Sequence, residues 1–201
     1  MTKRLLLARH AQADRQQVGR FLGSTDVPLS ELGLRQATAL AASFRLNQSV
    51  PLLVSPLRRA VETAECFDRE LRVESDLREI DFGRWEGLSF DEIASADGEG
   101  EVERWRDFDL QFAFPGGESL GGFVTRIARA ADRLASVASD TVIAVTHGGV
   151  IRAMICHLLG LEPRNYLLFD VKPASVTTID LFDGRGVLAG LGCTCHLKGI
   201  G

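Results

Sequence analysis

Short apolar runs typical of buried strands alternate along this chain with longer stretches of helical periodicity. The strand-like runs cover residues 5–8, 51–55, 141–146, 176–182 and 187–191, with a further short strand near residue 73, and the helical patterns cover residues 30–44, 57–71, 119–137 and 149–159. Such alternation predicts an α/β fold, a three-layer α/β/α sandwich with a mostly parallel central sheet. We expect one domain over residues 1–201. Residues 82–118 fit the alternation poorly, and we interpret them as a lid-like insertion over the edge of the sheet.

Composition narrows the classes of function. The formal net charge of −4 argues against a nucleic-acid surface, which is normally basic. No apolar run approaches the roughly 18 residues that a membrane span needs. The apolar stretch after Lys3 and Arg4 is also too short for a signal peptide, so we expect a cytoplasmic protein without nucleic-acid or membrane partners.

The four cysteines do not indicate a disulfide framework in a chain of this length. Cys66 and Cys156 fall in helical patterns and are interpreted as small buried side chains. Cys193, Cys195 and His196 are metal-ligand types close together in the tail. A closed zinc site needs about four ligands and no second cluster is apparent, so we expect no metal there.

The Arg9–His10 pair directly follows the first buried run. In open α/β sheets, ligands bind at the carboxyl ends of the strands. A guanidinium can clamp phosphate oxygens in a bidentate fork, and a neutral imidazole can attack phosphorus. The pair therefore indicates a phosphoryl site, provided that other anion-binding residues gather at the same edge.

Two further segments place anion-binding groups behind strands. Arg58 lies at the start of a predicted helix, where free N–H groups and the positive end of the helix dipole attract anions. His147 follows the run 141–146 and precedes Gly148 and Gly149, which let backbone approach a ligand closely. Each segment alone could also be a solvated helix start or a core histidine.

Residues 77–87 mix carboxyl groups with aromatic side chains. Glu79, Asp81 and Glu86 are candidates for a general acid, because a carboxyl group beside apolar rings has a raised pKa that suits proton donation. An ordinary charged loop would have the same composition.

Together these segments resemble the histidine phosphatase superfamily, the phosphoglycerate-mutase-like clan. The matching motifs run in the family's order from residue 4 to about residue 155, and they are Arg9–His10 and residues 19–23, 26–30, 33–37, 55–64, 77–87, 115–119 and 145–149. The set is specific, although each motif alone is not. The chain departs from the family at Ala11, where relatives usually have glycine, and at Gln16, where many have an asparagine on the substrate phosphate.

The resemblance implies a phosphoric monoester hydrolase of the histidine acid phosphatase type, without metal or other cofactor. His10 would be the nucleophile that becomes a phosphohistidine, and Glu79 would protonate the leaving alcohol. Arg9, Arg58 and His147 would hold the phosphoryl oxygens and stabilise their charge. The residues implied to bind substrate are Arg9, Gln16, Phe21, Leu22, Gly23, Arg58, Glu79, His147 and Gly148.

Residues 19–37 and 115–119 look most similar to the α-ribazole-5′-phosphate phosphatases of cobalamin assembly. Half of the aromatic residues lie in or beside the insertion, where they could receive a flat leaving group or only pack the insertion against the sheet. Between Glu86 and Pro115 the chain offers only Arg104 and Arg106 as cations, which is poor for the doubly charged substrate of a mutase.

Several alternatives stay open. They are a mutase-type phosphotransferase, a broad-specificity sugar-phosphate phosphatase, a metallohydrolase that uses His10, Asp14 and His147, and a non-catalytic module that binds a phosphorylated metabolite. The expected partner is a small-molecule phosphomonoester, and the chain could form a homodimer.

Overall fold

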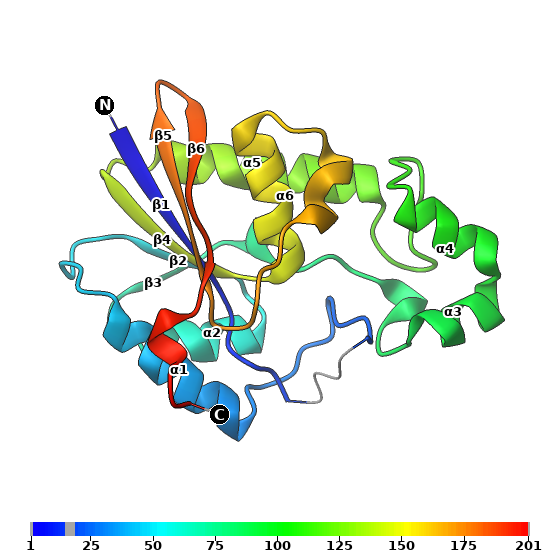
Figure 1. The fold of residues 1–201 in the computed structure, drawn as a ribbon, viewed down its shortest axis with the longest axis horizontal. Coiled ribbons are helices and arrows are strands. Elements are labelled where there is room, and N and C mark those ends of the chain that lie inside the picture. The colour runs from blue at the N-terminus through cyan, green and yellow to red at the C-terminus, as the bar shows by residue number, and fades with distance from the viewer. Residues whose placement is uncertain (1, 15–18, 201) are drawn as a thin grey trace.

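The computed structural model describes residues 2–14 and 19–200, and within these a six-stranded sheet forms the centre (Figure 1). The strands are β1 (Thr2–Arg9), β2 (Leu52–Val54), β3 (Leu71–Val73), β4 (Thr141–Thr146), β5 (Val176–Phe182) and β6 (Arg185–Cys193). Their order is β3-β2-β4-β1-β5-β6. Neighbours among β1 to β4 pair in parallel, whereas β5 and β6 add to β1 as antiparallel strands. The prediction of a mostly parallel sheet is therefore confirmed.

Helices cover both faces of the sheet (Figure 1). The α-helices of the described residues are α1 (Glu31–Ser43), α2 (Arg58–Glu65), α3 (Phe90–Asp97), α4 (Glu99–Arg106), α5 (Leu120–Ser136) and α6 (Gly148–Leu159). Side chains alternate between the faces along a strand. In β4, Val142 and Ala144 therefore pack with α5 and α6, and Ile143 and Val145 pack with α1 and α2. The three-layer α/β/α sandwich is confirmed.

Helix α2 is shorter than the helix predicted over residues 57–71. It ends at Glu65, and Asp68 adopts a left-handed conformation with φ of 47°. This backbone cannot continue a right-handed helix, so the chain turns back and enters β3 at Leu71. Phe67 anchors the turn by packing on Phe44, with ring centroids 5.1 Å apart.

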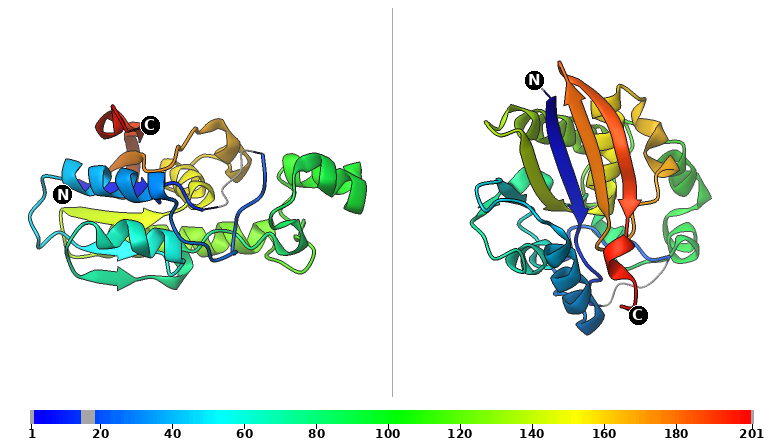
Figure 2. Two further views of the ribbon diagram at one scale, coloured as in Figure 1. Left: turned by 90° about the horizontal axis from the view of Figure 1, so that it is seen from below. Right: turned by 60° about the vertical axis from the view of Figure 1, so that its left-hand side comes forward.

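Residues 82–118, which we interpreted as an insertion and call the inserted segment, lie beyond the carboxyl ends of the parallel strands (Figures 1 and 2). We predicted a position over the edge of the sheet, but the lateral edges are β3 and β6. Trp85, Phe112 and Phe114 from this segment are fully buried and pack on one another, with 5.2 Å between the ring centroids of Trp85 and Phe114. These three rings therefore pack the inserted segment and do not need a role in receiving a leaving group.

The C-terminal segment reaches back to the end of β1. The ring Nε2 of His196 donates to the carbonyl oxygen of Ala174 at 2.9 Å, and the Ala174 N–H donates to the His10 carbonyl at 3.0 Å. The thiol sulfurs of Cys193 and Cys195 are 3.2 Å apart. Across residues 2–14 and 19–200, no group of three or more histidine, cysteine, aspartate or glutamate side chains is arranged to hold a metal ion. None of the helices in these ranges is long and apolar enough to cross a membrane.

Candidate active site

The Arg9–His10 pair and His147 lie together at the carboxyl ends of two neighbouring strands. Arg9 is the last residue of β1, His147 directly follows β4, and the parallel register places Arg9 beside Thr146. The ring centroids of His10 and His147 are 5.0 Å apart. Two segments far apart in the sequence thus meet at the edge where open sheets of this kind bind ligands.

His10 is held as a neutral imidazole that is protonated at Nδ1. Its Nδ1 lies 2.7 Å from the carbonyl oxygen of Ala11, and because a carbonyl can only accept, Nδ1 carries the proton and Nε2 the electron pair. Burial, then the charges of Arg59 and Arg9, hold the pKa of His10 well below its ordinary value of 6.5. In this neutral form, Nε2 carries the electron pair that can attack phosphorus.

The guanidinium that contacts His10 belongs to Arg59, not to Arg58. Arg59 is fully buried, and its Nε donates to His10 Nε2 at 3.3 Å. Its terminal nitrogens donate to the carbonyl oxygens of Gly23 at 2.6 Å and Thr25 at 2.8 Å. The Arg58 side chain is 59% exposed and pairs with Glu62 at 2.6 Å. The structure therefore does not bring Arg58 to the other predicted residues.

The sequence contained a signal that distinguishes the two arginines. Residues four apart share a helix face, so Arg59 shares its face with Thr63, and Arg58 shares its face with Glu62. Thr63 is buried, and its hydroxyl donates to the Arg59 carbonyl and accepts from the Ala11 N–H at 3.1 Å. A face made of small residues points inward more readily than one that carries a glutamate.

Arg9 and His147 carry buried nitrogens without a hydrogen-bond partner in the described part of the chain. These are Nε of Arg9, whose Nη1 donates to Val171, and Nδ1 of His147, whose Nε2 lies 2.6 Å from the Ser55 hydroxyl. Burial lowers the pKa of Arg9 to about 10, which leaves it charged at neutral pH. Burial, then the charge of Arg59, holds the pKa of His147 well below 6.5. The Arg9 Nε–H is a donor in every state, and a buried donor without a partner is costly, so this end of the site suits an anion.

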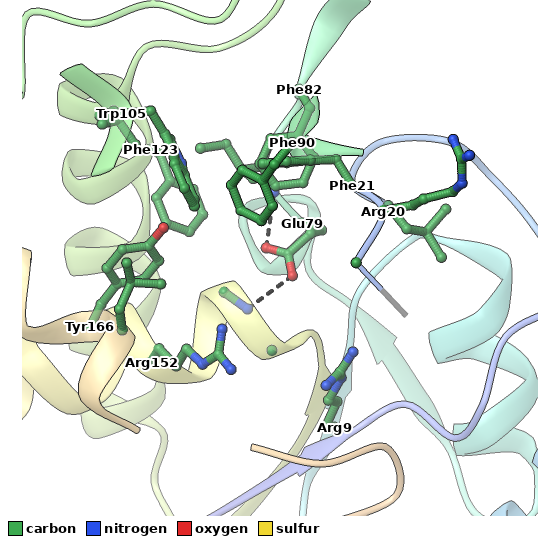
Figure 3. A pocket seen from close by; sticks show the side chains of 17 residues that line it. Arg9, Arg20, Phe21, Glu79, Phe82, Phe90, Trp105, Phe123, Arg152 and Tyr166 are labelled. Atoms are coloured by element: carbon green, nitrogen blue, oxygen red, sulfur yellow. Dashed lines mark hydrogen bonds between the residues drawn. The ribbon is translucent and has the colours of Figure 1, made fainter. Parts of the chain in front are cut away.

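Of the three candidate acids, only Glu79 faces the cavity described below. Its carboxylate accepts from the N–H groups of Ile80 at 3.0 Å and Gly149 at 2.9 Å (Figure 3). Asp81 and Glu86 instead accept from the loop that begins at Gly23, including the hydroxyl of Ser24. They shape the loop that receives Arg59.

Two glycines at the start of α6 allow the acid and Arg9 to approach the helix. A Cβ at Gly149 would lie 2.6 Å from Oε1 of Glu79, closer than a real contact allows. A Cβ at Gly148 would lie 3.3 Å from Cζ of Arg9. The glycines that follow His147 therefore provide close packing around the charged side chains.

A cavity of about 320 Å³ opens beside these groups (Figure 3). Arg9, Glu79 and Gly148 line one end of it. Much of the remaining wall is aromatic, and its rings are Phe21, Phe82, Phe90, Trp105, Phe123 and Tyr166. Phe82, Phe90 and Trp105 come from the inserted segment, so that segment contributes to the wall.

The other residues predicted to bind substrate have different positions. Phe21 and Leu22 line the cavity. Gly23 does not, because its carbonyl accepts from Arg59 and its N–H donates to Glu86. Gln16 lies outside the described residues. Sequence reasoning missed Arg59, and it also missed Arg152 and Tyr166, which line the cavity from α6 and from the following turn Pro163–Leu168.

The chain is similar to known proteins over most of its length. Residues 5–194 match the model of the histidine phosphatase superfamily, branch 1. The chain is 34% identical over 199 residues to phosphoserine phosphatase 1 of Hydrogenobacter thermophilus, covering 96% of this chain and 94% of that protein. It is 37% identical over 179 residues to the glucosyl-3-phosphoglycerate phosphatase of Mycobacterium tuberculosis, covering 82% and 78%.

A solved structure shows the same likeness in three dimensions. The crystal structure of a putative alpha-ribazole-5'-P phosphatase from Escherichia coli superimposes with a TM-score of 0.86 at 26% identity. The match covers 95% of this chain and 96% of that one.

Proposed function

The chain belongs to the histidine phosphatase superfamily, and we propose that it hydrolyses phosphomonoesters through a phosphohistidine at His10. The observation that carries this proposal is the state of His10. Its Nδ1 is committed to Ala11, and its Nε2 lies at the strand ends where Arg9, Arg59 and His147 converge. A neutral nucleophile beside two buried arginines suits attack on a dianionic phosphoryl group, and Nε of Arg9 is a buried donor still without a partner.

In the first step, Nε2 of His10 forms a bond to phosphorus as the bond to the ester oxygen breaks. Glu79, in its protonated form, gives its proton to the departing oxygen. Arg9, Arg59 and His147 stabilise the negative charge that spreads over the phosphoryl oxygens. The N–H groups at the start of α6 add to this stabilisation.

In the second step, water attacks the phosphohistidine. Glu79, now ionised, takes a proton from the water. At the same time the water oxygen bonds to phosphorus, and the bond between phosphorus and His10 Nε2 breaks. The products are inorganic phosphate and neutral His10, so the site returns to its starting state.

Charge pairing in the inserted segment favours hydrolysis over mutase-type transfer. Arg104 pairs with Asp109 at 2.9 Å, and Arg106 lies 3.6 Å from Glu103. Neither is among the residues that line the cavity. Both cations on which a mutase reading would depend are therefore engaged on the surface.

A panel of phosphomonoesters, with and without EDTA, tests this function. The panel includes p-nitrophenyl phosphate, O-phosphoserine, 3-phosphoglycerate and α-ribazole 5′-phosphate, and the measurement is release of inorganic phosphate. We expect hydrolysis that persists in EDTA, and a trapped phosphoenzyme that disappears in His10→Ala. His157→Ala is the matched control, because His157 is an exposed histidine paired with Asp132. Full turnover in His10→Ala, loss of turnover in EDTA, or binding of esters without turnover would each overturn the proposal.

A further inference from the structure

Arg152 of α6 points its guanidinium into the cavity, between Tyr166 and Arg9 (Figure 3). Its Nε donates to the carbonyl oxygen of Phe169 at 2.8 Å. In the described part of the chain this is its only hydrogen bond, and it forms no ion pair there. Because Nε is fixed, the side chain is oriented while both terminal nitrogens remain available to a ligand.

No carboxylate oxygen among the described residues lies within 4 Å of a nitrogen of the Arg152 guanidinium. The cavity lining contains three arginines and one acid, Glu79. Arg20 pairs with Glu92 at 2.6 Å, and Arg9 interacts electrostatically with Glu79 at the phosphoryl end. Arg152 is therefore a preoriented cation that faces the part of the cavity into which a leaving group would extend.

The residue that anchors the acid and the residue that carries this cation lie on the same helix. Gly149 donates to Glu79 at 2.9 Å, and Arg152 follows three residues later in the same helix. Their backbones are thus separated by about 4.5 Å along the helix axis. Glu79 and Arg152 line the same cavity, so a leaving group whose ester oxygen lies at Glu79 can extend toward Arg152.

We propose that Arg152 binds a carboxylate on the leaving group, so that the preferred substrates are phosphate monoesters of small hydroxy acids. This role rests on the phosphomonoesterase activity proposed above. A planar carboxylate accepts two parallel hydrogen bonds from the end of a guanidinium. The single positive charge of Arg152 also matches the single negative charge of a carboxylate, whereas two arginines, Arg9 and Arg59, lie at the end that would hold the dianionic phosphoryl group. An uncharged leaving group such as α-ribazole would leave Arg152 unpaired.

Two pairs of esters that differ at the carboxylate test this role. O-Phosphoserine is compared with O-phosphoethanolamine, and 3-phosphoglycerate with glycerol 3-phosphate. The measurement is the ratio of kcat/KM within each pair. We expect the wild type to prefer the carboxylated member of both pairs, and Arg152→Gln to reduce each ratio about 10- to 100-fold, the value of a hydrogen-bonded charge.

Matched variants separate the charge of Arg152 from its packing. Arg152→Lys keeps the charge without the fork, and we expect it to restore part of the ratio. Arg20→Gln removes a lining arginine that is already paired, and we expect its ratios to equal those of the wild type. Wild-type ratios near one, or an equal loss on both members of each pair in Arg152→Gln, would overturn the role of Arg152 alone. Absence of any His10-dependent hydrolysis would instead overturn the proposed function.

Discussion

Arg59 and Arg58 are adjacent in the sequence and have opposite surroundings, so the same substitution at each is a direct test of the site. Arg59 is fully buried with donors directed to His10, Gly23 and Thr25, whereas the Arg58 side chain is 59% exposed and pairs with Glu62. The two variants are Arg59→Met and Arg58→Met. Each removes a guanidinium and keeps an unbranched side chain that is compatible with a helix.

The expected magnitudes follow from these contacts. Loss of one preorganised donor to a developing oxyanion costs about 100- to 1,000-fold in kcat, so Arg59→Met should lose at least that. The buried carbonyl oxygen of Gly23 also loses its donor, at about 1–3 kcal/mol. At Arg58, an exposed pair four residues apart is worth about 0.3–0.5 kcal/mol, so we expect kcat to stay within about twofold of the wild type.

The assay is hydrolysis of p-nitrophenyl phosphate, with urea unfolding of both variants to select conditions in which each is folded. Urea unfolding also measures the loss of stability at Arg59. A loss of kcat above about tenfold in Arg58→Met, with Arg59→Met near wild type, would refute the conclusion that Arg59 rather than Arg58 serves the active site.

Three further predictions concern the acid and the buried histidines. Burial holds the pKa values of His10 and His147 well below 6.5, so in acid the unfolded chain binds more protons than the folded protein does. The unfolding free energy should therefore fall between about pH 7 and about pH 5, by up to about 1.4 kcal/mol per pH unit for each histidine. Urea unfolding at both pH values checks this, and an unchanged slope in His10→Gln would contradict it. Glu79→Gln should slow hydrolysis of alkyl phosphates much more than that of p-nitrophenyl phosphate, because a good leaving group needs little protonation; an equal loss for both would exclude the acid role. Gly149→Ala should lower kcat at least tenfold, because its Cβ would meet the Glu79 carboxylate at 2.6 Å. The control is Gly100→Ala, whose Cβ meets nothing within 4 Å and which should stabilise α4 by about 0.5–1 kcal/mol. Similar activities for the two variants would argue against the packing of Glu79 on α6.

Residues directly behind buried strands were predictable from the sequence. Arg9, His10 and His147 follow apolar runs, and in a parallel sheet the carboxyl ends of adjacent strands meet at one edge. Helical periodicity also located α1, which was expected over residues 30–44 and spans Glu31–Ser43. The helix expected over residues 57–71 was wrong at its C-terminal end, because pattern alone did not reveal the left-handed turn at Asp68.

Residues that reach the site from another element were not predictable in the same way. Arg152 was missed because cations were sought only in the inserted segment, while the cavity also receives a side chain from the second turn of α6. Arg58 was chosen over Arg59 because both stand at the helix start, and only the face each shares with its neighbours separates them. Sequence order says little about which helices border a cavity, since that depends on how the layers pack.

The pairing of β1 with β4 has a consequence for refolding. His10 and His147 come from opposite halves of the chain and become neighbours only when these strands pair. Contacts between residues so distant in sequence form slowly, because the intervening loop must close first. A partly folded chain with native helices and an open sheet would therefore have both histidines and no site. Recovery of phosphatase activity should then follow closure of the central sheet rather than the earlier return of helical signal.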